Sequence, residues 1–228
     1  MRLPLKAMNG EELAWTLLRD RGFRVHWGQS GEDAVLERVF DRKKNGFYVD
    51  IGCHHPRELS NTYVLHRFYD WSGINVDASP ESIRLFNEAR PKDININTLI
   101  GEGKEEVEFV LFKDLARSTA DAATINDLKR RGFAIVSTTK MRPRTLKSIL
   151  DEHVKRGQEI DLLSVDIESF DLAALKTSDW SKYRPKVVCV EDHAFKHQDG
   201  ETEIRAYMRS IDYKIASHCF DTSIYSRG

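Results

Sequence analysis

Short apolar runs and segments with helical spacing alternate along the chain. The runs predict strands at residues 47–51, 74–76, 94–100, 107–112, 133–138, 160–167, 186–190 and 213–219. Apolar residues recur at helical spacing over residues 35–40, 60–71, 79–86, 146–154, 172–175 and 203–211. This alternation predicts an α/β fold built on a doubly wound parallel sheet.

Three of these helices are preceded by side chains that are typical of helix starts. Ser30 and Asp33 have the S-x-x-D spacing of a capping box for the first helix. Ser79, followed by Pro80, predicts the N-cap of the third helix. Asp171 predicts the N-cap of the short helix at 172–175. We therefore expect these side chains to accept hydrogen bonds from the first turns of their helices.

The organisation of the chain is that of one domain with a short N-terminal extension. Apolar residues at helical spacing predict a helix over residues 11–21, so we assign residues 1–28 to an N-terminal helical extension. No linker-like, repetitive or low-complexity stretch interrupts the rest of the 228 residues. One core suffices for a chain of this length. Residues 29–228 are therefore predicted to form a single domain.

Composition excludes several classes of partner. The formal net charge of −1 lacks the basic surplus expected of a nucleic-acid-binding protein. No apolar run approaches the ~20 residues that cross a bilayer, so we predict no transmembrane segment and a cytoplasmic location. The three cysteines, Cys53, Cys189 and Cys219, lack C-x-x-C spacing and favour buried reduced thiols. A small molecule or a glycan is the expected partner, and homo-oligomerisation is left open.

The stretch VDIGCHHP, residues 49–56, places Asp50 and Gly52 at the end of the first predicted strand of the sheet. Ligands of open α/β sheets bind outside the carboxyl ends of the strands, so this is where a cofactor would be held. The glycines of a dinucleotide fingerprint are missing, because Cys53, His54 and His55 follow Gly52. A pyrophosphate is therefore not the expected ligand.

A second acidic residue, Asp77, ends the next predicted strand about 25 residues further on. A carboxylate in this position commonly accepts hydrogen bonds from both ribose hydroxyls of a nucleotide-like cofactor. Together, Asp50, Gly52 and Asp77 indicate an adenosine-type cofactor. The alternative is that both aspartates only cap loops in an ordinary α/β domain.

These residues resemble the FkbM-type S-adenosylmethionine-dependent methyltransferases, and the resemblance extends from about Gln29 onward. It is carried by GQSGED (28–33), VDIGCHHP (49–56), SNTY (60–63), GINVDASP (73–80), RPKDININ (90–97), ARSTAD (116–121), LLSVDIESFDLAAL (162–175) and DWSKYRPKVVCVEDH (179–193). Two departures are Ser169, where the family often has Gly, and the His-Pro turn in place of a second Gly.

The resemblance implies a Rossmann-like doubly wound sheet of the class I methyltransferase type and S-adenosyl-L-methionine as cofactor. It implies O-methylation of a sugar or glycan hydroxyl. It adds Gln29, Ala78 and Ser118 to the cofactor side. Ser60, Asn61 and Thr62 either cap a helix or bind the carboxylate of the methionine part, or do both. The polar stretch that contains ARSTAD, residues 116–121, is a candidate substrate loop.

Acidic residues end two later strands and supply candidates for the chemistry. Asp166 and Glu168 are two apart on the predicted strand 160–167, so both should point to one face beside the cofactor. Methyl transfer to a hydroxyl needs a group that accepts its proton. Glu168 is our first choice and His193 the second, unless His193 is neutral and only donates to Glu191.

Three carboxylates, Asp166, Glu191 and Asp192, are expected at neighbouring strand ends. They would repel one another unless protonated, paired or bound to a metal, and oxygen ligands suit Mg²⁺ or a similar divalent cation. The alternative is that Arg184 or Lys186 neutralises them, or that Asp192 faces solvent. The adjacent His54 and His55 either bind a metal or the methionine part, or satisfy backbone groups.

The sequence therefore predicts a methyltransferase acting on a sugar hydroxyl, with the substrate class taken from the resemblance alone. A polyketide or other natural-product hydroxyl is the alternative acceptor. A nicotinamide-dependent oxidoreductase is disfavoured by the missing glycines. A non-catalytic cofactor-binding domain is disfavoured because the acids at the strand ends occur together.

Overall fold

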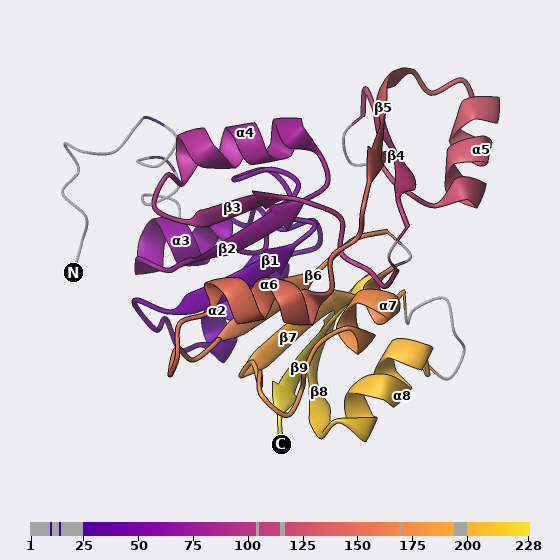
Figure 1. Cartoon of the computed structure of the whole chain (residues 1–228). Coiled ribbons are helices and arrows are strands. Elements are labelled where there is room, and N and C mark those ends of the chain that lie inside the picture. Colours follow the sequence, from indigo (N-terminus) through magenta and orange to yellow (C-terminus); the bar gives the residue numbers. More distant parts are fainter. Residues whose placement is uncertain are drawn as a thin grey trace.

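The computed structural model describes residues 25–103, 105–114, 117–168, 170–193 and 200–228, together with positions 10 and 14 (Figure 1). The helix predicted at 11–21 lies outside these residues apart from position 14. The boundary at residue 28 stays a prediction. Just before it, the ring of Trp27 packs against Tyr63 with centroids 5.1 Å apart.

A seven-stranded sheet forms the centre of the molecule, in the order β3-β2-β1-β6-β7-β9-β8 (Figure 1). Five neighbouring strands are parallel, namely β3 (Ile94–Asn97), β2 (Ser72–Asp77), β1 (Phe47–Ile51), β6 (Leu162–Val165) and β7 (Val187–Glu191). The strands β9 (Thr222–Arg227) and β8 (Tyr213–Cys219) add an antiparallel hairpin at the β7 edge. The Rossmann-like fold is confirmed.

Helices cover both faces of this sheet. On one face lie α6 (Leu146–His153), α7 (Asp171–Lys176) and α8 (Glu203–Ser210), whose apolar residues join Val49 and Ile51 in the larger core. On the other lie α2 (Glu32–Val39) and α3 (Tyr63–Tyr69), which pack around Tyr48. Neighbouring residues of β1 therefore serve opposite cores, as strand geometry requires. The helix α4 (Pro80–Ala89) packs against β2 and β3.

A smaller unit stands apart from the central sheet (Figure 1). It pairs β4 (Val107–Phe112) with β5 (Ile135–Met141) in antiparallel fashion and carries α5 (Ala122–Arg130) between them. The sequence predicted both strands but not α5. Ile125 and Leu128 of this helix are buried against Val110 and Phe112, so the unit has a core of its own.

The local predictions had mixed outcomes. Ser79 is confirmed as an N-cap, because its side chain accepts from the Ser82 N–H at 3.2 Å. The capping box at Ser30 was wrong: the N-cap of α2 is Gly31 at φ 85°, and no side chain caps the helix. A glycine adopts this left-handed conformation without a Cβ clash, so the turn itself starts the helix.

The prediction for Asp171 was also wrong. Phe170 is the N-cap of α7, and Asp171 is the first residue inside the helix. Its carboxylate instead accepts from the Ile167 N–H at 3.0 Å, which fastens the turn that follows β6. The three cysteines are buried free thiols, as predicted. Within the described residues, no helix has both the length and the apolar character needed to cross a bilayer.

Candidate active site

A cavity opens at the carboxyl ends of β1, β2 and β6 and encloses about 1090 Å³, its open mouth included. Phe109 of β4 and residues 118–120 wall one side of it. The sequence-predicted cofactor residues that line it are Gln29, Asp50, Gly52, Ser60, Asn61, Asp77, Ala78, Ser118 and Asp166. Segments far apart in the sequence therefore meet at one place, where ligands of open α/β sheets bind.

Gly52 fixes the turn that leaves β1. Its φ is 77°, and a Cβ at this position would lie 1.7 Å from the carbonyl oxygen of Asp166. Its N–H donates to the Val76 carbonyl at 2.8 Å. The turn is therefore pressed between the ends of β2 and β6, and any side chain here would force the three strand ends apart.

Asp77 holds two loops at the end of β2. Its carboxylate accepts from the N–H groups of His54 at 2.8 Å and Ser79 at 2.7 Å. Burial raises the pKa of Asp77 to about 6, against the lowering effect of these two hydrogen bonds. Each carboxylate oxygen has a second lone pair. Asp77 can thus hold the loops and still accept hydrogen bonds from a ligand.

Thr62 does not line the cavity, and it does not cap α3 with its side chain. Its hydroxyl donates to Asp50 at 2.8 Å. Asp50 is buried, and this burial raises the pKa of its carboxyl. Thr62 therefore supports Asp50 from behind the cavity wall.

Arg90, which the sequence analysis did not single out, organises the loop between β1 and α3. The side chain is buried, and its guanidinium donates to the Tyr48 hydroxyl at 2.8 Å and to Thr62 at 2.9 Å. It also donates to the carbonyl of Pro56 and to Ser60 at 3.3 Å. A buried cation of this kind fixes the segment that brings Ser60 to the cavity.

Asp166 and Glu168 both line the cavity, but not from one face of a strand. The strand β6 ends at Val165, so both residues lie on the turn that follows it. Burial raises the pKa of Asp166 well above its usual range, and the nearby carboxylates of Glu191 and Glu168 add to this. Glu168 has a φ of 52°, a conformation that costs a non-glycine residue of order 1–3 kcal/mol.

The predicted carboxylate trio is not brought together. Asp192 is buried on another side, where it accepts from the Tyr225 hydroxyl at 3.0 Å and faces Arg205 at 3.4 Å. Adjacent residues at a strand end point to opposite faces, so Asp192 is turned away from Glu191. The expected neutralising cations are engaged elsewhere: Arg184 donates to the Ile211 carbonyl, and Lys186 pairs with Glu159 and Asp161.

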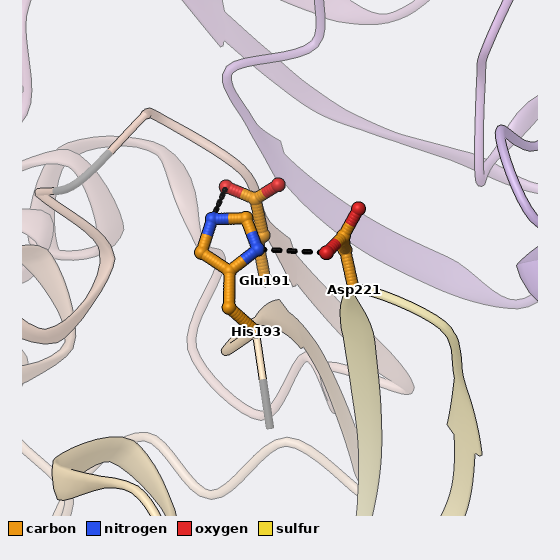
Figure 2. Close-up of side chains that lie close together, drawn as sticks. All are labelled: Glu191, His193 and Asp221. Atoms are coloured by element: carbon orange, nitrogen blue, oxygen red, sulfur yellow. Dashed lines mark hydrogen bonds and ion pairs between the residues drawn. The ribbon is translucent and has the colours of Figure 1, made fainter. Parts of the chain in front are cut away.

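A different group forms at the end of β7. His193 does not line the cavity; its Nδ1 lies 2.8 Å from Asp221, and its Nε2 lies 3.5 Å from Glu191 (Figure 2). Its φ is 45°. Asp221 is on the turn between β8 and β9. No sequence pattern indicated a role for Asp221, because β9 was not predicted.

The two adjacent histidines of the first turn have separate roles. His55 accepts at Nδ1 from the N–H groups of Arg57 at 3.1 Å and Glu58 at 2.9 Å. This agrees with the alternative that the histidines satisfy backbone groups. His54 lines the cavity, and burial lowers its pKa. The ring centroids are 6.5 Å apart.

The charge of the cavity wall is one-sided. Its carboxylates are Asp50, Asp77, Asp166 and Glu168, and the described lining residues include no Lys or Arg. Such a wall attracts a cationic ligand and repels phosphate groups.

Comparison with known proteins agrees with the fold. The model of the methyltransferase FkbM domain matches residues 50–215, well over half of the chain. A comparison with curated proteins finds no match. The chain belongs to the FkbM methyltransferase family.

Proposed function

We propose that this member of the FkbM methyltransferase family transfers a methyl group from S-adenosyl-L-methionine to a hydroxyl of a sugar or glycan. One observation carries the cofactor assignment: four carboxylates and no described Lys or Arg line the cavity. S-adenosylmethionine carries positive charge on its sulfonium and ammonium groups. A nicotinamide dinucleotide would instead bring a pyrophosphate to a wall that offers it no cation. This disfavours the oxidoreductase alternative.

The residues at hand fit the cofactor by type and position. Asp77 is the acceptor for the ribose hydroxyls, with Ala78 beside it, because it ends β2 and retains acceptor capacity. Asn61 donates to the Ser164 hydroxyl of β6 at 3.3 Å, and Asp166 follows the end of β6, so their amide and carboxyl oxygens can accept hydrogen bonds from an ammonium group on this side. Gln29, Asp50, Gly52, Ser60, Thr62 and Ser118 complete the proposed cofactor set, Thr62 acting through Asp50.

The chemistry that the cofactor supplies is an electrophilic methyl group, which leaves sulfur as a bond to the acceptor oxygen forms. The chain must position that hydroxyl and accept its proton. Glu168 is the proposed base, since its carboxylate lines the cavity. Asp166 lies two residues before it, and the charge of Glu168 helps to raise the pKa of Asp166, because neighbouring carboxylates disfavour each other's charged form. His193 lies outside the wall and is the second candidate.

A sugar hydroxyl is proposed as the acceptor on the family resemblance. The hydroxyl groups of Ser118 and Thr119, which line the cavity, are hydrogen-bonding partners of the kind that a polyol needs. A natural-product hydroxyl would be methylated by the same groups.

The cofactor is tested by thermal unfolding with S-adenosylmethionine, S-adenosylhomocysteine and NAD. A ligand at 100 times its dissociation constant stabilises the folded state by ~2.7 kcal/mol. We expect both adenosyl compounds to raise the melting temperature and NAD to leave it unchanged. Asp77→Ala should lose most of the shift, whereas Asp127→Ala on the exposed side of α5 should keep it. A larger shift with NAD would overturn the cofactor assignment.

The acceptor is tested separately, by incubation with labelled methyl donor and a panel of deoxysugar glycosides and phenolic natural products. Label on sugars alone supports the proposal. Label on the phenols alone would replace the acceptor class and leave the cofactor assignment standing.

A further inference from the structure

We propose that Glu191, His193 and Asp221 bind a divalent transition-metal ion beside the methyl-transfer cavity. One ligand atom from each residue can be chosen so that all three lie within 4.8 Å of one another. Metal bonds of 2.0–2.2 Å place two ligands of one ion at most ~4.4 Å apart. Small side-chain rotations would therefore bring the three atoms onto one ion. The imidazole already lies between the two carboxylates (Figure 2).

The backbone under this group is held on both sides. Glu191 ends β7 and pairs in register with Thr222, the first residue of β9. The carbonyl of Asp221 accepts from the N–H groups of Asp192 at 2.8 Å and His193 at 3.0 Å. Two segments nearly thirty residues apart are thus joined directly at the three ligand positions. Ion binding needs no rearrangement of the chain, which lowers its entropic cost.

The side chains remain accessible to an ion. Their exposed fractions are 13% for Glu191, 40% for His193 and 18% for Asp221. Partial burial on one side leaves coordination positions for water or for an acceptor on the other, as in metal sites that act on substrates.

The ligand types decide which ion is expected. Carboxylates alone would suit Mg²⁺ or Ca²⁺, but an imidazole nitrogen favours Mn²⁺, Co²⁺ or Zn²⁺. This differs from the oxygen-only site predicted from the sequence. Asp192 has no part in it, since its carboxylate faces Arg205 and the Tyr225 hydroxyl.

The position suggests a use that rests on the proposed function. Val165 of β6 pairs in register with Val190 of β7, so Glu191 and Asp166 of the cavity wall follow at adjacent strand ends, and the ion would lie at the edge of the cavity. There it could hold oxygens of the acceptor. Binding of the ion itself does not depend on this use.

The test uses the full chain after treatment with chelator and dialysis. Co²⁺ and Mn²⁺ are titrated in separate samples, with calorimetry for both, the visible spectrum for Co²⁺ and electron paramagnetic resonance for Mn²⁺. We expect one ion per chain. His193→Gln and Asp221→Asn should each weaken it at least tenfold. His153→Gln, which changes a histidine of α6 outside the group, should bind as the unchanged protein does.

Absence of saturable binding, or equal binding by both variants, would overturn the proposal. Circular dichroism checks that the variants are folded, and Glu191→Gln provides a third ligand variant if one of them is not. The thermal shift with S-adenosylmethionine is measured on the same samples without metal. If Asp221→Asn keeps the thermal shift with S-adenosylmethionine but no longer binds the ion, loss of the metal site and loss of cofactor binding are distinguished.

Discussion

Asp171 should destabilise the protein at neutral and alkaline pH, and Asp171→Asn should remove that effect. The carboxyl is buried at the start of α7, and burial, followed by the charge of Asp166, raises its pKa to about 7. In the unfolded chain it returns to ~3.9. The folded state therefore binds the proton more tightly, and stability falls as pH rises from about 4 to about 7.

The magnitude follows from the size of the shift. Three pKa units at 1.36 kcal/mol each give a penalty on the order of 4 kcal/mol above pH 7, as an upper bound. Asparagine keeps an oxygen that can accept from the Ile167 N–H, so the fastening of the turn is retained. We expect Asp171→Asn to be more stable than the unchanged protein at pH 8, by roughly 2–4 kcal/mol. At pH 4 the two proteins should be alike.

The assay is urea unfolding at pH 4, 6 and 8, with the free energy of unfolding extrapolated to water. Asp151→Asn is the matched control, because side-chain hydrogen bonds from Lys147, Lys182 and Tyr183 lower the pKa of Asp151. The ionised carboxylate of Asp151 therefore stabilises the folded state at neutral pH, and this contribution is lost in acid. Asp151→Asn should accordingly be less stable than the unchanged protein at pH 8, the opposite of the change expected for Asp171→Asn. If Asp171→Asn lowers the free energy of unfolding equally at all three pH values, ionisation of Asp171 does not destabilise the folded protein.

The remaining predictions concern the base, the cofactor and the buried cation. Glu168→Gln should lower turnover at least ~10²-fold, while calorimetry should find cofactor affinity nearly unchanged. His193→Ala should lower turnover less. The reverse ranking of the two variants would make His193 the base. Because the pKa of Asp77 is about 6, affinity for S-adenosylmethionine should fall about fivefold between pH 6 and pH 5, and Asp77→Asn should flatten that dependence. An equally steep profile in the variant would exclude Asp77. Arg90→Met should lower the free energy of unfolding, measured in urea, by at least ~3 kcal/mol, because the buried hydroxyls of Tyr48 and Thr62 lose their donor. A loss below ~1 kcal/mol would contradict this expectation.

The fold could be predicted because its strands are buried on both faces. Buried parallel strands consist of near-continuous apolar runs, and the sequence shows such runs for β1, β6 and β7, with Asp50 and Ser164 as the polar residues inside them. The strand β9 has no such run, since only Ile224 and Tyr225 are apolar and they are flanked by Thr222, Ser223 and Ser226. It belongs to the sheet through antiparallel pairing with β7 and β8, a long-range contact that periodicity does not encode.

The cofactor side of the site could be predicted because its residues follow strand ends. Strand ends meet at one edge of a parallel sheet whatever the side-chain rotamers are. Arg90 and Asp221 were missed for the opposite reason. Each acts through contacts made across the molecule: Arg90 reaches Tyr48 of β1, and Asp221 meets His193 across the β7–β9 pairing.

Glu168 shows how far such reasoning reaches. Its place after β6 follows from the sequence, but its φ of 52° does not, since nothing in the residue type favours a left-handed backbone. The conformation persists because the turn is held on both sides: the Asp166 N–H donates to Ile51 at 2.9 Å, and Asp171 binds the Ile167 N–H. Strain kept in place by its surroundings is a feature of functional sites. The proposed base is therefore positioned by Asp171, which carries a stability cost of its own, and the two residues should be considered together.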